Sequence, residues 1–210
     1  MPGAFEGETV TRRRFMSVAA QGSGAVAVAA IALPALGFAI GPIFSPLTWS
    51  WQPIGPPSDF PSSTYATKVI TIVPNIGEAG NSIAYVRARN PQLDTEPETK
   101  WNHWVALSSR CMHLGCPVRY VAAAQRFICP CHGGVYDFLG QVVGGPPVRP
   151  LDRFYTRYNP ANGLVELGPR YSVNDQLQAF SPRDPAQPLN GIGQYLYPKR
   201  FDTAPGPAGY

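Results

Sequence analysis

All four cysteines of this 210-residue chain, and two of its three histidines, lie in two short segments. Residues 111–116 read Cys-Met-His-Leu-Gly-Cys, and residues 129–132 read Cys-Pro-Cys-His. Cysteines and histidines scattered for structural reasons would not gather in this way. Because thiolates and imidazoles bind transition-metal ions, the two segments, called here the first and second boxes, predict a metal centre.

Several familiar sites fit this donor pattern poorly. Two plain disulfides would use the cysteines but not the histidine that accompanies them in each box. A structural zinc ion takes four ligands and would leave two cysteines over. Haem attachment needs Cys-x-x-Cys-His, from which the second box is one residue short, and a redox Cys-x-x-Cys pair fails for the same reason. A ferredoxin cluster with four thiolate ligands would leave both histidines without a role.

The boxes closely resemble the Cys-x-His-x-Gly-Cys and Cys-x-Cys-His boxes of the Rieske iron–sulfur protein family, in particular those of cytochrome bc-type complexes. The resemblance implies one [2Fe–2S] cluster with two cysteines on one iron and two histidines on the other: Cys111, Cys129, His113 and His132. It also implies a disulfide between the two remaining cysteines, Cys116 and Cys131, which would persist in an exported protein.

This mixed ligand set has a chemical consequence. Thiolates donate charge and favour Fe(III), whereas neutral imidazoles do not, so the histidine-bound iron accepts an electron more readily. Each imidazole also keeps a second nitrogen that can gain or lose a proton. Such a centre takes an electron and a proton together, and quinol oxidation releases both.

The resemblance also assigns the contact with quinol. It gives His132 the hydrogen bond to quinol, with His113 as the other cluster histidine at the catalytic site. Leu114 would form an apolar lip against the quinone ring, and ordinary loop packing of Leu114 is the alternative.

Residues around the boxes are expected to cover the cluster and to set its potential. The stretch 144–148 resembles the family's covering loop, with Gly145, Pro146 and Pro147 over the cluster. Tyr136 stands where the family has a hydroxyl that donates to a ligand sulfur, but Gly134 replaces the serine donor of high-potential members. Hydrogen bonds to cluster sulfurs raise the potential, so we expect a value in the lower part of roughly −150 to +300 mV, suited to menaquinol rather than ubiquinol.

The N-terminal region resembles an export signal joined to a membrane anchor. Residues 11–16 read Thr-Arg-Arg-Arg-Phe-Met, which resembles the twin-arginine signal of bacterial proteins that are exported already folded. Residues 18–40 are apolar and, at ~1.5 Å per residue, can cross a ~30 Å hydrocarbon core. Because the arginines stand only before the span, we expect a cytoplasmic segment 1–16, a single-pass anchor 17–44 in the cell membrane and a head on the outer side. A cleaved signal peptide is the alternative.

The rest of the chain is predicted to be mostly β. Four prolines in residues 52–64 indicate a flexible tether, assigned to 45–64. The head is assigned to 65–168 as a Rieske-type antiparallel β-sandwich with a cluster-binding subdomain at 109–151. Residues 169–210 are assigned to an extended tail that lies on the head or on a partner, for which disorder is the alternative. Runs rich in Val, Ile, Thr and Tyr predict strands at 66–73, 82–89, 104–108, 154–158 and 164–167.

Composition excludes one class of function. The net charge is only +4, and no basic stripe with interleaved aromatic residues occurs, so nucleic-acid binding is not expected. The third histidine, His103, lies outside both boxes and is predicted to be an ordinary strand histidine.

The resemblance implies the electron-transfer subunit of a quinol:cytochrome c oxidoreductase. Its head would move on the tether between a cytochrome b-type membrane subunit and a c-type cytochrome. The alternative is the Rieske small subunit of an arsenite-oxidase-like molybdenum enzyme. A soluble Rieske ferredoxin is disfavoured by the export signal and by the second pair of cysteines.

Overall fold

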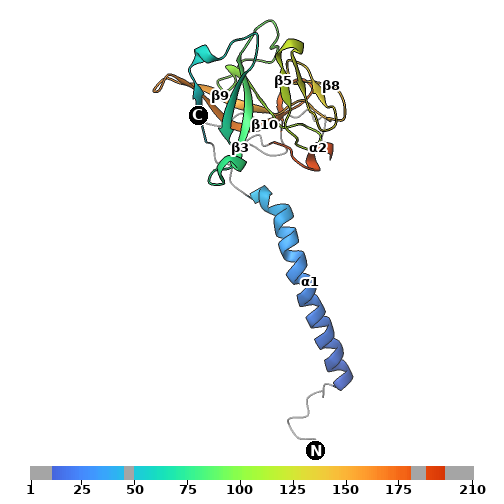
Figure 1. The fold of residues 1–210 in the computed structure, drawn as a ribbon. Coiled ribbons are helices and arrows are strands. Elements are labelled where there is room, and N and C mark those ends of the chain that lie inside the picture. Colours follow the sequence, from blue (N-terminus) through green and yellow to red (C-terminus); the bar gives the residue numbers. More distant parts are fainter. Residues whose placement is uncertain (1–10, 45–49, 181–187, 197–210) are drawn as a thin grey trace, which may run out of the picture. The chain divides into compact units, whose positions relative to one another are not determined.

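The computed structural model describes residues 11–44, 50–180 and 188–196. The chain divides into two compact units, Met1–Thr48 and Trp49–Tyr210, and each is described by itself. The first unit contains one long helix, α1 (Arg12–Phe44), and the described strands all belong to the second (Figure 1).

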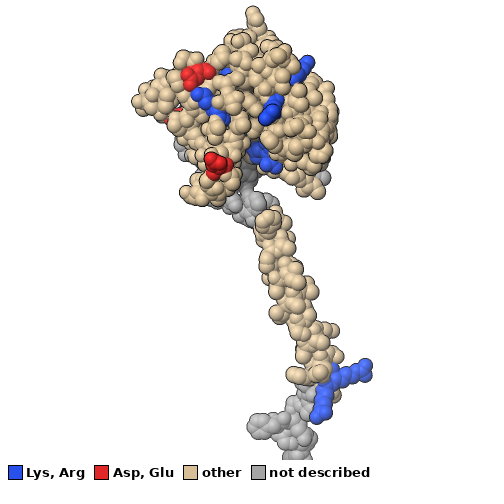
Figure 2. Space-filling view, in the orientation of Figure 1, with Lys and Arg blue, Asp and Glu red and all other residues tan. Residues whose placement is uncertain are grey.

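Helix α1 has the length and composition of a membrane span. The segment Arg12–Ile40 comprises 29 residues with a mean hydropathy of 2.1, long and apolar enough to cross a bilayer. Its charged side chains are the three arginines at the N-terminal end (Figure 2). The helix already begins at Arg12, so the expected division after residue 16 falls inside it, because Arg and Met are good helix formers.

The second unit is built on a seven-stranded antiparallel sheet with the order β1-β10-β9-β4-β3-β2, in which β11 pairs with β10. Its strands are β1 (Gln52–Gly55), β2 (Ala66–Thr71), β3 (Asn81–Ala88), β4 (Trp104–Ser108), β9 (Arg153–Asn159), β10 (Leu164–Val173) and β11 (Ala179–Phe180). Single turns of helix are η1 (Pro57–Asp59), η2 (Gly77–Gly80), η3 (Ala122–Ala124) and α2 (Gly193–Leu196). The prediction of a mostly antiparallel β head with one N-terminal apolar helix is confirmed.

A smaller sheet carries the two boxes. Its order is β5-β6-β7-β8, with β5 (Arg119–Val121), β6 (Arg126–Ile128), β7 (Val135–Tyr136) and β8 (Val142–Gly144). All four strands lie within the predicted cluster-binding segment 109–151. Phe127 of β6 pairs with Tyr136 of β7, and both are fully buried. They pack in one hydrophobic core with Leu107 of β4 and with Tyr65, which directly precedes β2. The two sheets therefore share one hydrophobic core, and this core includes Cys111 and Cys129 of the boxes.

The predicted tether is wrong over residues 52–64, which belong to the head. Strand β1 pairs with β10, and Ile54 and Phe60 are 8% and 2% exposed within the core of the large sheet. The prolines do not prevent this, because β1 lies at the end of the sheet order, where Pro53 is tolerated. The rest of the predicted tether, residues 45–49, lies outside the described residues.

The predicted boundary between head and tail at residue 168 is also wrong. Strand β10 continues to Val173, and β11 adds a further pair. Tyr171, Val173 and Leu177 are buried together with Trp101, and this burial stabilises the continuation that local composition did not reveal.

Candidate metal centre

The two boxes lie at neighbouring ends of short strands. The first box follows β4 and precedes β5, and the second forms the turn between β6 and β7. In the first, the Cys111 amide donates to the Cys116 carbonyl at 2.8 Å. In the second, the Cys129 amide donates to the Gly134 carbonyl at 2.7 Å. Each box is thus a closed loop held by its own backbone.

The predicted sulfur ligands are buried. Cys111 and Cys129 are 1% and 2% exposed, whereas Cys116 is half-buried and Cys131 is exposed. The sulfurs of Cys116, Cys129 and Cys131 lie within 4.8 Å of one another. All four cysteines are free thiols in this structure, so the disulfide between Cys116 and Cys131 stays a prediction.

The two box histidines come together. The ring centroids of His113 and His132 are 4.8 Å apart, with the ring planes at 88°. His113 is half-buried, and within the described part of the chain its buried Nδ1 has no hydrogen-bond partner. Buried polar atoms normally have a partner, and a metal ion would supply one here. The donor set of two buried sulfurs and two adjacent imidazoles therefore fits a cluster of the Rieske kind.

The exposed edge of the site is formed by His132 and Leu114. His132 is exposed, and Leu114 is 63% exposed although it is a large apolar side chain. By contrast, His103 lies outside the site, with its Nδ1 2.6 Å from a carboxylate oxygen of Glu98.

Tyr136, which lies in the hydrophobic core, contacts the first box through its hydroxyl. Its hydroxyl accepts a hydrogen bond from the Met112 amide at 2.8 Å and lies 3.2 Å from the Cys111 sulfur. Burial, followed by the Cys111 contact, raises the pKa of Tyr136 above its ordinary value, so the phenol keeps its proton. Since the oxygen already accepts from Met112, that proton is available to the sulfur.

The thiol environments differ. Burial raises the pKa of Cys111, although Tyr136 and the His113 backbone amide stabilise its thiolate. Burial acts in the same direction at Cys129, but hydrogen bonds from the Cys131 backbone amide, the Cys111 side chain and the His132 backbone amide together hold the pKa of Cys129 below its usual range. The hydrogen bond with Cys116 raises the pKa of Cys131 to about 12.

The loop after β8 packs directly on Gly133 and Gly134, which follow the second box. A Cβ at Gly145, where φ is +82°, would lie 2.5 Å from the Gly133 carbonyl oxygen, and a Cβ at Gly134 would lie 2.7 Å from Cγ of Pro147. The buried Pro147 ring therefore occupies the space that a serine side chain at position 134 would need. Pro146 and Gly145 of this loop are exposed. Position 134 thus carries no hydroxyl donor, and the Pro147 ring fills the space beside it.

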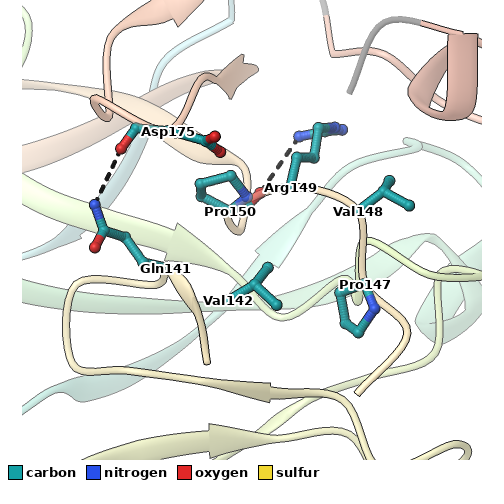
Figure 3. A pocket seen from close by; sticks show the side chains of 7 residues that line it. All are labelled: Gln141, Val142, Pro147, Val148, Arg149, Pro150 and Asp175. Carbon is teal, nitrogen blue, oxygen red and sulfur yellow. Dashed lines mark hydrogen bonds between the residues drawn. The ribbon is translucent and has the colours of Figure 1, made fainter. Parts of the chain in front are cut away.

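A cavity of about 330 Å³ lies beside this loop and does not contain the predicted ligands. One wall is Pro147 and Val148, and Gln141 on another wall donates to the Asp175 carbonyl at 3.1 Å. Figure 3 shows these residues around the cavity with the side chain of Arg149. The candidate site itself reaches solvent at His132 and Leu114.

Two residues that sequence reasoning did not select also reach the first box. Gln194 Nε2 donates to the His113 carbonyl at 2.7 Å, and the Tyr195 hydroxyl donates to the same oxygen. Both lie in the segment expected to be an extended tail. The tail was expected to lie on the head or on a partner, but nothing in the local sequence identifies the His113 carbonyl, about eighty residues away, as its contact.

Comparisons with known proteins identify the family. The model of the Rieske [2Fe-2S] domain matches residues 50–155, half of the chain. The chain belongs to the Rieske [2Fe–2S] domain family, and its cofactor is a Rieske-type iron–sulfur cluster.

Several relatives align over most of the chain. The menaquinol:cytochrome c reductase iron-sulfur subunit of Geobacillus thermodenitrificans is 29% identical over 76% of this chain and 91% of that protein. The cytochrome b6-f complex iron-sulfur subunit of Chlorobaculum tepidum is 25% identical over 78% of this chain and 79% of that protein. A third relative, the carotenoid phi-ring synthase of C. tepidum, is 48% identical over 26% of this chain, which spans only 8% of that enzyme's length.

Proposed function

We propose that this chain is the electron-transfer subunit of a quinol:cytochrome c oxidoreductase of the cytochrome bc type, not catalytically complete by itself. The observation that carries the proposal is the pairing of the two box histidines, whose rings are adjacent and one of which is exposed, in the same two loops as two buried cysteines. The relatives that align over most of the chain are named as subunits of such complexes.

The residues have distinct roles in this proposal. Cys111 and Cys129 hold one iron, and His113 and His132 hold the other. When bound, the cluster supplies one-electron chemistry at a potential raised by the imidazoles. The exposed His132 imidazole accepts the quinol proton on its remaining nitrogen, and the exposed Leu114 side chain provides apolar contact for the quinone ring. The electron then passes to a c-type cytochrome.

We further propose that α1 anchors the chain in the cytoplasmic membrane, with its N-terminus inside and the head outside. The arginines at the start of an otherwise uncharged helix support this orientation. Thr11–Met16 serves as a twin-arginine signal, which suits a protein folded around its cluster before export.

Co-purification tests the host complex. The tagged full chain, extracted from membranes in mild detergent, should carry b-type and c-type haem with it. Molybdopterin in place of haem would instead establish the arsenite-oxidase-like alternative. Loss of quinol:cytochrome c reduction when the subunit is depleted from the membranes provides the functional measurement.

The redox potential tests the menaquinol assignment. We expect the midpoint in the lower part of the roughly −150 to +300 mV Rieske range, because Gly134 provides no hydroxyl donor and Pro147 fills its surroundings. Replacing Tyr136 by Phe should lower the midpoint further, by on the order of 50 mV, because a donor to the Cys111 sulfur is lost.

The matched control for Tyr136→Phe is Tyr120→Phe. The buried Tyr120 hydroxyl packs against the same core and, among the described residues, has no hydrogen-bond partner. This variant should keep the wild-type midpoint in a redox titration monitored by EPR. An unchanged midpoint in Tyr136→Phe would show that the phenol does not act on the cluster.

The pairing of Cys116 with Cys131 is tested by thiol chemistry. In protein isolated from its native membrane, we expect neither residue to react with iodoacetamide until a reductant is added, as judged by mass spectrometry. The Cys116→Ser variant should lose its cluster about tenfold faster under a chelator, because the two box loops are no longer joined covalently. Alkylation of both residues without reductant would contradict the disulfide.

A further inference from the structure

Residues 188–196, called here the C-terminal strap, are fastened to the head near the covering loop. The Leu189 amide donates to Ser172 Oγ at 2.8 Å, and the Leu189 carbonyl accepts from Arg149 Nη2 at 2.7 Å. Arg149 is itself fully buried and paired with Asp152. One end of the strap is therefore fixed to a rigid, charged part of the core.

The other end of the strap binds one atom of the first box. The Gln194 side-chain amide and the Tyr195 hydroxyl both donate to the carbonyl oxygen of His113. A carbonyl has two lone pairs, so this oxygen is saturated by the strap. Gln194 is only 6% exposed, and a buried amide is costly without such a partner.

The other supports of this loop hold a different part of it. Tyr136 binds the Met112 amide, and the Gly115 amide donates to the Cys111 carbonyl at 2.9 Å. Among the described residues, both donors to the His113 carbonyl lie on the strap. Tyr136 thus fixes the cysteine side of the loop, and the strap fixes the histidine side.

We propose that the C-terminal strap is a positioning element for the cluster ligand His113, with Gln194 and Tyr195 as its positioning residues. The inference rests on the proposed role of His113 in the cluster. The backbone of a ligand residue sets where its imidazole can lie, and partners beyond the ligands commonly fix that orientation. Without the strap, the peptide after His113 loses its fixed direction, and the loop opens more often.

Hydrogen exchange of the full-length protein in detergent measures this opening. The Cys111 and Gly115 amides, both bonded within the loop, report on it. We expect exchange in peptides covering 110–118 to accelerate about fivefold in Gln194→Ala or Tyr195→Phe and about 25-fold in the double variant. Cluster absorbance under a chelator should decay faster in the same order.

The matched control is Ile192→Ala on the same strap, since Ile192 is 76% exposed. It should leave exchange and cluster decay unchanged. Gln194→Glu, which keeps the shape but puts a carboxylate against the carbonyl, should open the loop at least as much as Gln194→Ala.

Two results would overturn the proposal. One is unchanged exchange at 110–118 in the double variant. The other is equal acceleration at 110–118 and in β3, which would mean that the strap stabilises the whole head rather than the loop. Because exchange is measured with or without bound iron, a protein that lacked the cluster would refute the proposed function and leave the test of the strap intact.

Discussion

Replacing either His113 or His132 by alanine is expected to yield a folded head without its cluster. The two rings lie 4.8 Å apart, and in the proposed ligand set each supplies one of the two imidazole ligands. Iron and acid-labile sulfide should fall from about two of each per chain to near zero. The rhombic EPR signal of the reduced protein and its visible absorbance should disappear with them.

The third histidine supplies the control for these variants. His103 is half-exposed and paired with Glu98 outside the site, so His103→Ala should retain full iron, sulfide and EPR intensity. An EPR spectrum that is unaltered when His113 or His132 is replaced would refute both the ligand assignment and the proposed electron-transfer function. Far-UV circular dichroism distinguishes loss of the iron–sulfur cluster from unfolding. The hydrophobic core shared by the two sheets contains neither histidine, so the fold should survive these substitutions.

Replacing Gly145 by alanine should displace the covering loop and destabilise the head by about 3 kcal/mol. The new Cβ would meet the Gly133 carbonyl oxygen at 2.5 Å and the Gly134 Cα at 2.8 Å, and both are backbone atoms that cannot rotate away. The positive φ of +82° adds the usual cost of a left-handed alanine. Chemical denaturation and the rate of cluster loss measure the effect.

Gly77→Ala separates the destabilisation caused by steric overlap from that caused by a left-handed backbone conformation. Gly77 also has a positive φ, +63°, but a Cβ there would meet nothing within 4 Å. We expect a loss of only about 1 kcal/mol and an unchanged rate of cluster loss. Equal destabilisation in both variants would mean that the covering loop is not packed tightly against Gly133 and Gly134.

Local composition was sufficient for some parts of the fold. The five predicted strands correspond to β2, β3, β4, β9 and β10, because β-branched and aromatic residues occur there in short runs between turn residues. The small sheet was not predicted strand by strand. Its strands are only two or three residues long, and they are stabilised by packing of Phe127 and Tyr136 rather than by local pattern.

The proline content of residues 52–64 predicted a flexible tether, and this prediction was wrong. Prolines favour extended chain in a linker and on an edge strand alike, so composition does not distinguish the two. Pairing of Gln52 with Leu167 and burial of Phe60 decide between them, and both depend on residues far away in the chain.

Residue types and their spacing were enough to predict a Rieske-type metal centre, its candidate ligands and an apolar span before them. Ligand identity is a property of residue types, and spacing within a loop is local, so both can be read without coordinates. The packing of Pro147 beside Gly134, and the hydrogen bonds from Gln194 and Tyr195 to the His113 carbonyl, became visible only in the folded chain. Such contacts join segments that are far apart in the sequence and meet only after folding, so no local pattern of residues predicts them.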